Sequence, residues 1–223
     1  MSENILRFGS DCGARRSEDE PLLTGRGRFT DDIDVPGQAH AAFVRAPVGH
    51  AGIRGVDVSK ARAMPGVIGV FTGKDLAAEG LGAIPPAASF PGRGGKPMFA
   101  AAMPPLAAAR VRYVGEAIAV VVAETLAQAQ DAVEAVVADL AELAAAADVE
   151  RAMAPGAPTI WPEAPDNVAF DWTDGDAPAV EAALTGAAHV ARVRLLDTRL
   201  APAALEPRAA IGQWDATTER YTL

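Results

Sequence analysis

The sequence is poor in cysteine and in long apolar runs, and each shortage excludes a class of protein. Cys12 is the only cysteine among 223 residues. It cannot form an internal disulfide, and alone it cannot hold a zinc ion or an iron–sulfur cluster, which need about four ligands. No segment reaches the ~20 apolar residues of a membrane span, and the N-terminus lacks the apolar region of a secretory signal. We therefore expect a cytoplasmic protein without a membrane partner, with Cys12 exposed in a polar stretch.

Aromatic residues and clustered positive charge are also scarce. Aromatic residues make up 5% of a chain that is 50% hydrophobic, so alanine and valine dominate the apolar content and favour thin, closely approaching layers. The formal net charge is −9. The arginines of the N-terminal region (Arg15, Arg16, Arg26 and Arg28) are interleaved with acidic residues. Because phosphate binding depends on clustered cations, we expect no nucleic-acid partner.

Hydrophobic patterns predict alternating strands and helices over the first two thirds of the chain. Strands are expected at residues 38–45, 53–56, 67–71 and 112–123, a short helix at 59–64 and a helical turn at 72–78. The apolar run 118–122 is typical of a central strand. Thr125 and Gln128 then match a capping box, which predicts a helix start.

Two stretches rich in proline and glycine, 80–105 and 151–178, predict long irregular segments. Residues 1–20 are expected to be extended, and 21–34 to form loops and turns. Beyond the second irregular segment, strands are expected at 191–195, 209–214 and 220–223, and the last two form a hairpin around 215–218. Because the sequence ends within that hairpin, the sheet is expected to be incomplete.

Searches for catalytic motifs find no active site. Residues 90–97 superficially resemble a phosphate-binding loop, but Phe90 and Pro97 occupy positions that require glycine and serine or threonine. His40, His50 and His189 lie on different elements without metal-ligand spacing, so structural or surface roles are expected. The sequence contains no nucleophile elbow and no Cys-x-x-Cys pair.

Three charged residues remain as candidates. Glu116 follows Gly115 in an apolar strand region, so it is expected to be semi-buried and hydrogen-bonded to a neighbouring loop, or to support a site. Glu206 lies just before an expected strand and could pair with Arg208 or orient a loop. Glu116, Glu206 and Arg208 are therefore candidate residues at an interface or beside a site that other residues complete.

Many blocks, in order along nearly the whole chain, resemble the start of the large subunit in the xanthine dehydrogenase, aldehyde oxidase and carbon monoxide dehydrogenase family. The matching blocks are residues 15–16, 18–19, 23–29, 31–33, 36–37, 40–45, 47, 50–51, 64–67, 71–76, 111–116, 119–125, 155–158, 167, 175–176 and 206–209.

The resemblance implies an α+β fold: a hammerhead-type mixed sheet with packed helices, followed by the incomplete start of a second α/β domain. It implies an extended segment at 1–19, the hammerhead domain at 20–140, a connector at 141–186 and the first strands of a molybdopterin-binding domain at 187–223. It also implies a strand after the capped helix. The composition of residues 137–147, which is rich in alanine and lacks aromatic residues, favours a helix there instead.

The resemblance further implies that the chain is the N-terminal portion of a molybdenum hydroxylase large subunit. The complete enzyme would carry molybdopterin in its cytosine dinucleotide form, with 2Fe-2S and FAD on partner iron–sulfur and flavin subunits. The family's catalytic and cofactor-binding residues would lie beyond Leu223, so none is assigned here. Purines, aldehydes, N-heterocycles and carbon monoxide all stay open as substrates. A stand-alone, non-catalytic hammerhead-type scaffold is the alternative, and an independent nucleotide-binding α/β protein is a weaker third.

Overall fold

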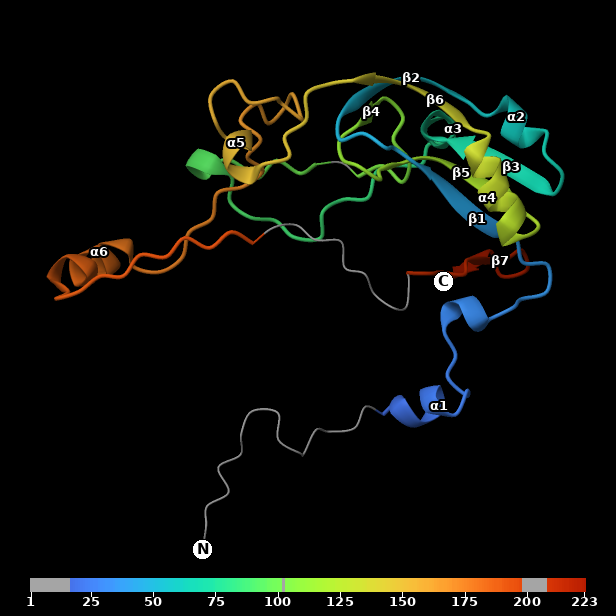
Figure 1. Ribbon diagram of the computed structural model, residues 1–223, viewed down its shortest axis with the longest axis horizontal. Coiled ribbons are helices and arrows are strands. Elements are labelled where there is room, and N and C mark those ends of the chain that lie inside the picture. The colour runs from blue at the N-terminus through green and yellow to red at the C-terminus, as the bar shows by residue number, and fades with distance from the viewer. Residues whose placement is uncertain (1–16, 102, 198–207) are drawn as a thin grey trace, which may run out of the picture. The chain divides into compact units, whose positions relative to one another are not determined.

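A computed structural model describes residues 17–101, 103–197 and 208–223. The described residues fall into two compact units. The larger unit is Gln38–Ala191, and the other combines the described parts of Met1–Gly37 and Arg192–Leu223. Figure 1 shows the elements of both.

The larger unit is built around an antiparallel sheet of three strands, in the order β1-β5-β3. β1 spans His40–Arg45, β3 spans Val67–Thr72 and β5 spans Ala117–Ala123. The central position predicted for the apolar run in β5 is confirmed, because β5 pairs with β1 on one side and β3 on the other (Figure 1).

One face of this sheet is covered by helix α4 (Leu126–Glu134), with α2 (Ser59–Arg62) beside it. Ala129 and Ala132 of α4 are fully buried against Val70 and Val121 of the sheet. Methyl side chains let a helix approach a strand closely, so the alanine-rich composition produces thin layers here, as the sequence predicts.

Helix α4 begins at the predicted capping box. The Thr125 hydroxyl accepts a hydrogen bond from the Gln128 backbone N–H at 3.3 Å, and the Thr125 backbone N–H donates to Gln128 Oε1 at 3.1 Å. Each side chain thereby satisfies an amide that the first helical turn leaves unpaired.

Replacing Thr125 with alanine is expected to lower the free energy of unfolding by about 1 kcal/mol, because the cap is lost while the helix face remains. Urea unfolding of the chain measures this loss. Thr125→Ser keeps the hydroxyl and is the matched control, so an equal loss in both variants would contradict the capping explanation.

A second antiparallel sheet has the strand order β4-β2-β6. β2 spans Ala51–Asp57, β4 spans Arg110–Val111 and β6 spans Val137–Glu142. The helix that composition favoured at residues 137–147 is therefore wrong, and the strand that the family resemblance implied is present. β6 pairs with β2 from Ala51 to Asp57, and these ladder hydrogen bonds outweigh the helix propensity of alanine.

The two proline-rich stretches contain little regular structure, as predicted. Helix α3 (Gly73–Ala78) precedes the first stretch, whose described residues contain the single turn η2 (Arg93–Gly95) and two isolated bridges, Ile84 with Met103 and Pro91 with Pro97. A one-turn helix α5 (Val149–Ala152) opens the second. Helix α6 (Ala177–Gly186) then follows, within the predicted connector; the sequence patterns did not predict it, and all its residues are exposed.

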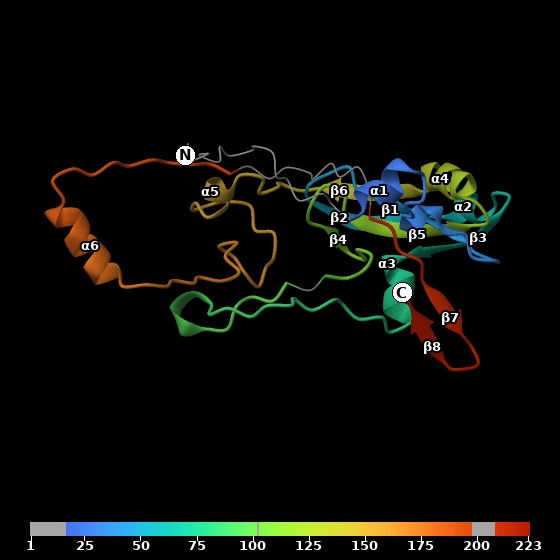
Figure 2. The same cartoon turned by 90° about the horizontal axis from the view of Figure 1, so that it is seen from below.

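The other unit contains helix α1 (Asp19–Leu23), the turn η1 (Thr30–Asp32) and the hairpin of β7 (Gln213–Asp215) and β8 (Arg220–Thr222). The predicted hairpin is confirmed with shorter strands, and Figure 2 shows the two strands side by side. α1 and η1 lie where only extended chain, loops and turns were expected.

The strand expected at residues 191–195 is wrong. This segment forms no helix or strand, and Val193 and Leu195 are 78% and 88% exposed. Alternating apolar residues form a strand only where a neighbouring strand supplies hydrogen bonds, and no described strand pairs with this segment. Among the described residues, no helix combines the length and the apolar character that crossing a membrane requires.

Candidate functional site

Glu116 lies in the tight turn between β4 and β5, and its side chain is only 6% exposed. Its Oε2 accepts a hydrogen bond of 2.6 Å from the Arg112 backbone N–H. The backbone also closes the turn, because Gly115 N–H donates to Ala46 O and Ala46 N–H donates to Glu116 O. Gly115 adopts a φ of 87°, which favours glycine. Glu116, expected to be semi-buried, is buried. Residues 112–116, expected in a strand, form this turn, and the carboxylate hydrogen-bonds within the turn rather than to a neighbouring loop.

The Arg112 side chain joins this turn to the second irregular segment. Its guanidinium carbon lies 3.5 Å from the centre of the Trp161 ring, which is a close cation–π contact. Its Nε is buried without a hydrogen-bond partner. Burial lowers the pKa of Arg112 below its usual value, while the nearby charge of Glu116 acts in the opposite direction.

Aromatic residues then tie the two proline-rich stretches to one another. The rings of Phe90 and Phe170 stack with centroids 4.9 Å apart, and those of Phe99 and Trp161 lie 5.5 Å apart. A backbone hydrogen bond of 2.7 Å runs from Phe99 N–H to Ala169 O. The sequence patterns did not predict this pairing. The signal available was that five of the chain's few aromatic residues lie in these two stretches.

Asn167 holds the second stretch in shape. Its Oδ1 accepts from the Ile160 N–H at 3.0 Å, and its Nδ2 donates to Ala152 O and Pro158 O, both at 2.9 Å. Its φ of 57° lies in the left-handed region, which asparagine tolerates better than most residues. Sequence reasoning assigned Asn167 no role beyond the family resemblance.

Replacing Asn167 with alanine is expected to destabilise residues 152–167 locally by about 1–2 kcal/mol, because partly buried backbone groups lose their hydrogen-bond partners. Amide hydrogen exchange should speed up there and stay unchanged in the β1-β5-β3 sheet. Asn167→Gly also removes the hydrogen bonds but tolerates the positive φ, so any loss of protection in this variant comes from the hydrogen bonds alone. Protection like that of the wild type in Asn167→Gly would contradict this role.

The histidines and the remaining candidates do not gather into a site. His50 is 4% exposed, its Nδ1 lies 2.8 Å from Ala144 O, and its Nε2 is buried without a partner, so the predicted structural role is confirmed. His189 is exposed. Arg208 is exposed, whereas Glu206 and Cys12 lie outside the described residues. No group of three His, Cys, Asp or Glu side chains within the described ranges could hold a metal ion.

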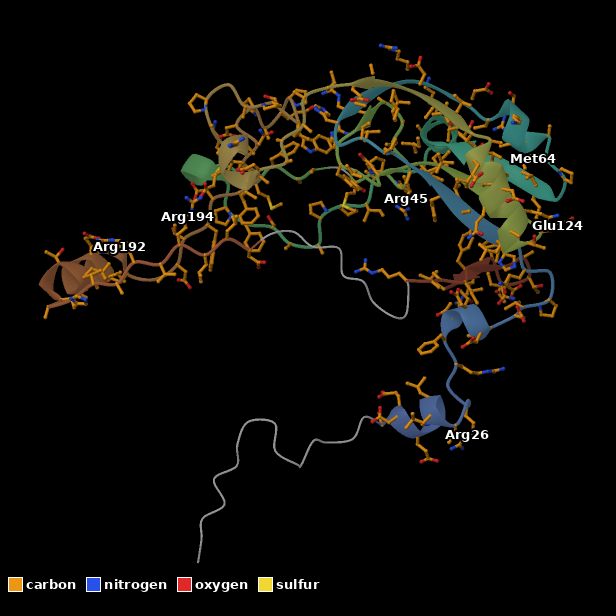
Figure 3. The ribbon with its side chains drawn as sticks, in the orientation of Figure 1. Arg26, Arg45, Met64, Glu124, Arg192 and Arg194 are labelled. Carbon is orange, nitrogen blue, oxygen red and sulfur yellow. The ribbon has the colours of Figure 1, made fainter. Side chains whose placement is uncertain are left out.

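The second face of the β1-β5-β3 sheet carries an apolar row that helix α4 does not cover. Phe43 and Phe71 both pair in register with Val120, so the three side chains form one row across the sheet, called the aromatic row below. Phe43 is 47% exposed and Phe71 45%. The Arg45 guanidinium, labelled in Figure 3, lies 5.4 Å from the Phe43 ring.

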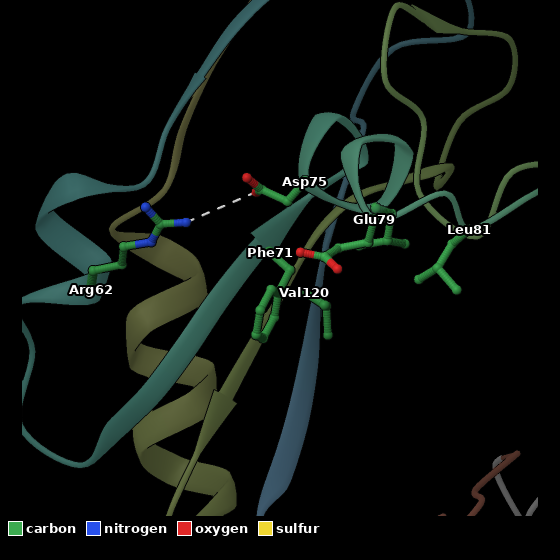
Figure 4. A pocket seen from close by; sticks show the side chains of 7 residues that line it. Arg62, Phe71, Asp75, Glu79, Leu81 and Val120 are labelled. Atoms are coloured by element: carbon green, nitrogen blue, oxygen red, sulfur yellow. Dashed lines mark ion pairs between the residues drawn. The ribbon is translucent and has the colours of Figure 1, made fainter.

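A hollow of about 500 Å³ adjoins the aromatic row at Phe71. Its remaining lining residues come from α2, α3, the chain after α3 and β5; they are Arg62, Asp75, Leu76, Glu79, Leu81 and Val120 (Figure 4). The Thr72 side chain, which caps α3, lowers the pKa of Asp75 by hydrogen bonding to its carboxylate. This arrangement is an apolar surface with charged margins.

Comparison with known proteins identifies the family to which this architecture belongs. The model of the aldehyde oxidase and xanthine dehydrogenase a/b hammerhead domain matches residues 24–144. The chain belongs to this hammerhead family. Over 93% of its length it is 39% identical to the nicotine 6-hydroxylase large subunit of Paenarthrobacter nicotinovorans, of which it covers 24%.

Solved structures agree with this assignment. Quinoline 2-oxidoreductase from Pseudomonas putida 86 matches with a TM-score of 0.74 and 33% identity, covering 93% of this chain and 25% of that one. A Cu,Mo-CO dehydrogenase matches with a TM-score of 0.62 and 30% identity, covering 80% of this chain and 22% of that one. The hammerhead chain thus spans about a quarter of the length of these three relatives. The family match and the solved structures confirm the hammerhead-type fold expected from the sequence.

Proposed function

We propose that the hammerhead chain serves as the N-terminal portion of a molybdenum hydroxylase large subunit. There it would shape and brace the subunit and contact its partners. The observation that carries this proposal is the family match over residues 24–144, together with coverage of about a quarter of oxidoreductase large subunits. In the corresponding domain division, 20–140 is the hammerhead domain, 141–186 a connector and 187–223 the first strands of a molybdopterin-binding domain.

The C-terminal hairpin supports this division. Trp214 and Tyr221 pack with ring centroids 4.5 Å apart across β7 and β8, yet they are 50% and 83% exposed. A two-stranded hairpin is marginally stable in water, and further strands or a packing partner stabilise it. A larger sheet, to which this hairpin contributes two strands, would provide the further strands and a packing partner.

In the proposed enzyme, molybdopterin, in its cytosine dinucleotide form, supplies the oxidation–reduction chemistry. Partner subunits hold 2Fe-2S and FAD, and the cytoplasm is the proposed compartment. The described residues do not fit the metal, because they contain no cluster of ligating side chains and the carboxylate of Glu116 already accepts the Arg112 N–H. We therefore derive no step of the reaction from this chain.

We propose an aromatic N-heterocycle as the substrate class. Two of the relatives are named for their action on nicotine and on quinoline. Each of these two compounds contains an aromatic ring with a nitrogen atom. Carbon monoxide is the alternative that the Cu,Mo-CO dehydrogenase favours.

The test is to purify the tagged chain from its native host with everything that assembles on it. Metal analysis should find molybdenum and iron, and flavin fluorescence should be present. Reduction of an artificial electron acceptor should depend on quinoline or nicotine and not on carbon monoxide. A chain that purifies alone, melts cooperatively and carries no molybdenum would overturn the proposal and favour the stand-alone scaffold.

A further inference from the structure

We infer that the aromatic row and the adjoining hollow dock a segment of a molybdenum hydroxylase large subunit that lies outside the quarter matched by this chain. The segment presents an apolar side chain and, next to it, a lysine or arginine. This inference rests on the proposed function and names the surface through which the hammerhead domain is held in the subunit.

The sheet face that carries the aromatic row is covered at one end only. Ile118 lies two residues before Val120 on β5, hence on the same face, and it is only 1% exposed. The chain at Ala107, which hydrogen-bonds to Ala117 O at 2.8 Å, lies beside it in the same apolar cluster. The face is therefore covered at one end, while Phe43 and Phe71 stay nearly half exposed on the adjacent part. Contiguous exposed aromatic residues of this kind mark an interaction site, whereas single exposed apolar residues need no explanation.

The charges around the hollow define the partner further. Arg62 and Asp75 pair with each other at 3.9 Å, so their charges largely cancel. Glu79 forms no ion pair with any described residue, and Figure 4 shows its side chain extending over the hollow toward Phe71 and Val120. A carboxylate at the margin of an apolar surface favours a partner with a complementary cation, because burial without one costs free energy.

The length of the matched relatives identifies the source of the segment. The chain covers 24% of one relative and 25% of a solved one, so about three times as much polypeptide accompanies the matched part in each. The aromatic row lies within residues 24–144, the part that the family model matches. A second copy of this chain is the competing occupant, and the experiment distinguishes the two.

The experiment compares variants of the tagged chain, each purified from the native host with its assembly partners. Phe71→Glu is expected to reduce the molybdenum that copurifies per chain at least tenfold, because it places a charge on the apolar surface. Leu126→Glu is the matched control: Leu126 is 49% exposed on α4, which covers the opposite face, and its molybdenum content should equal that of the wild type. The melting temperature of each isolated variant shows that it still folds.

Two further measurements sharpen the result. Glu79→Gln should reduce copurifying molybdenum about threefold at low salt, and this difference should vanish at high salt, which screens exposed charge pairs. Hydroxyl-radical labelling of Phe43 and Phe71 should fall about tenfold in the assembled enzyme relative to the isolated chain.

Three outcomes would overturn the inference. If Phe71→Glu and Leu126→Glu copurify with equal molybdenum while the wild type carries molybdenum, only the docking surface is wrong. The isolated chain could form a dimer that Phe71→Glu separates, while Phe71 stays reactive in the molybdenum enzyme, which assigns the face to a second copy. A wild-type chain without molybdenum overturns the proposed function first and the docking partner with it.

Discussion

Replacing Ile118 with alanine is expected to lower the free energy of unfolding by about 2–5 kcal/mol. Ile118 lies in the central strand β5 and is one of the largest fully buried side chains, at 1% exposed. It packs in the cluster that contains Val44 and Val111, where the neighbours are mostly small residues fixed on paired strands. Such neighbours cannot collapse into the space left by three missing carbon atoms, so the cavity persists and adds to the lost burial.

Urea unfolding of the isolated chain measures this effect. Ile118→Val removes one methylene group and should cost about 0.5–1.5 kcal/mol, so the two variants together show whether the loss scales with removed volume. Val137→Ala is the surface control, because Val137 is 63% exposed on β6 and should change stability by less than about 0.5 kcal/mol. A loss of under 1 kcal/mol in Ile118→Ala would contradict the packing described for this cluster.

Sequence patterns predicted an element correctly where residues close together in the sequence determine its structure. The Thr125–Gln128 capping box predicts the start of α4 because both partners lie within one helical turn. The apolar run of β5 predicts a central strand because side chains in the middle of a sheet are more buried than those at its edges, and β5 pairs with β1 on one edge and β3 on the other. At Glu116 only the burial was predicted: residues 112–116 form a turn instead of the expected strand, and the donor is Arg112 N–H in that turn.

Local rules failed where the decisive partner is distant in the sequence. Residues 137–142 become β6 because Ala51–Asp57 provides a strand for them to pair with, and alanine content carries no information about that strand. Residues 191–195 show the opposite case. Their alternating apolar residues, Val193 and Leu195 among them, predict a strand, but no described strand pairs with this segment.

The candidate docking surface could not be predicted for the same reason. Phe43 and Phe71 lie in separate strands, and they form one row only because Val120 pairs with both. Without the strand order β1-β5-β3, each is an isolated phenylalanine in an alternating pattern and would be assigned to the core. The aromatic contacts between the two proline-rich stretches depend in the same way on tertiary structure.

Replacing Glu116 with alanine is expected to lower the free energy of unfolding by about 1.5–3 kcal/mol, because a hydrogen bond to a charged acceptor is lost and the partly buried Arg112 amide is left unpaired. Glu116→Gln should keep most of the stability, since its amide oxygen can still accept the Arg112 N–H. The same pair of variants also tests what the carboxylate does in the proposed enzyme.

A glutamate that only shapes the turn between β4 and β5 needs an acceptor oxygen at the position that accepts the 2.6 Å hydrogen bond, and its charge is secondary. The activity of the molybdenum-containing assembly should then be proportional to the fraction of the chain that is folded. Glu116→Gln should therefore retain activity, and Glu116→Ala should lose activity on warming as it unfolds. A site-supporting glutamate requires the charge itself. Glu116→Gln would in that case abolish turnover at unchanged melting temperature, and that result would refute the structural role.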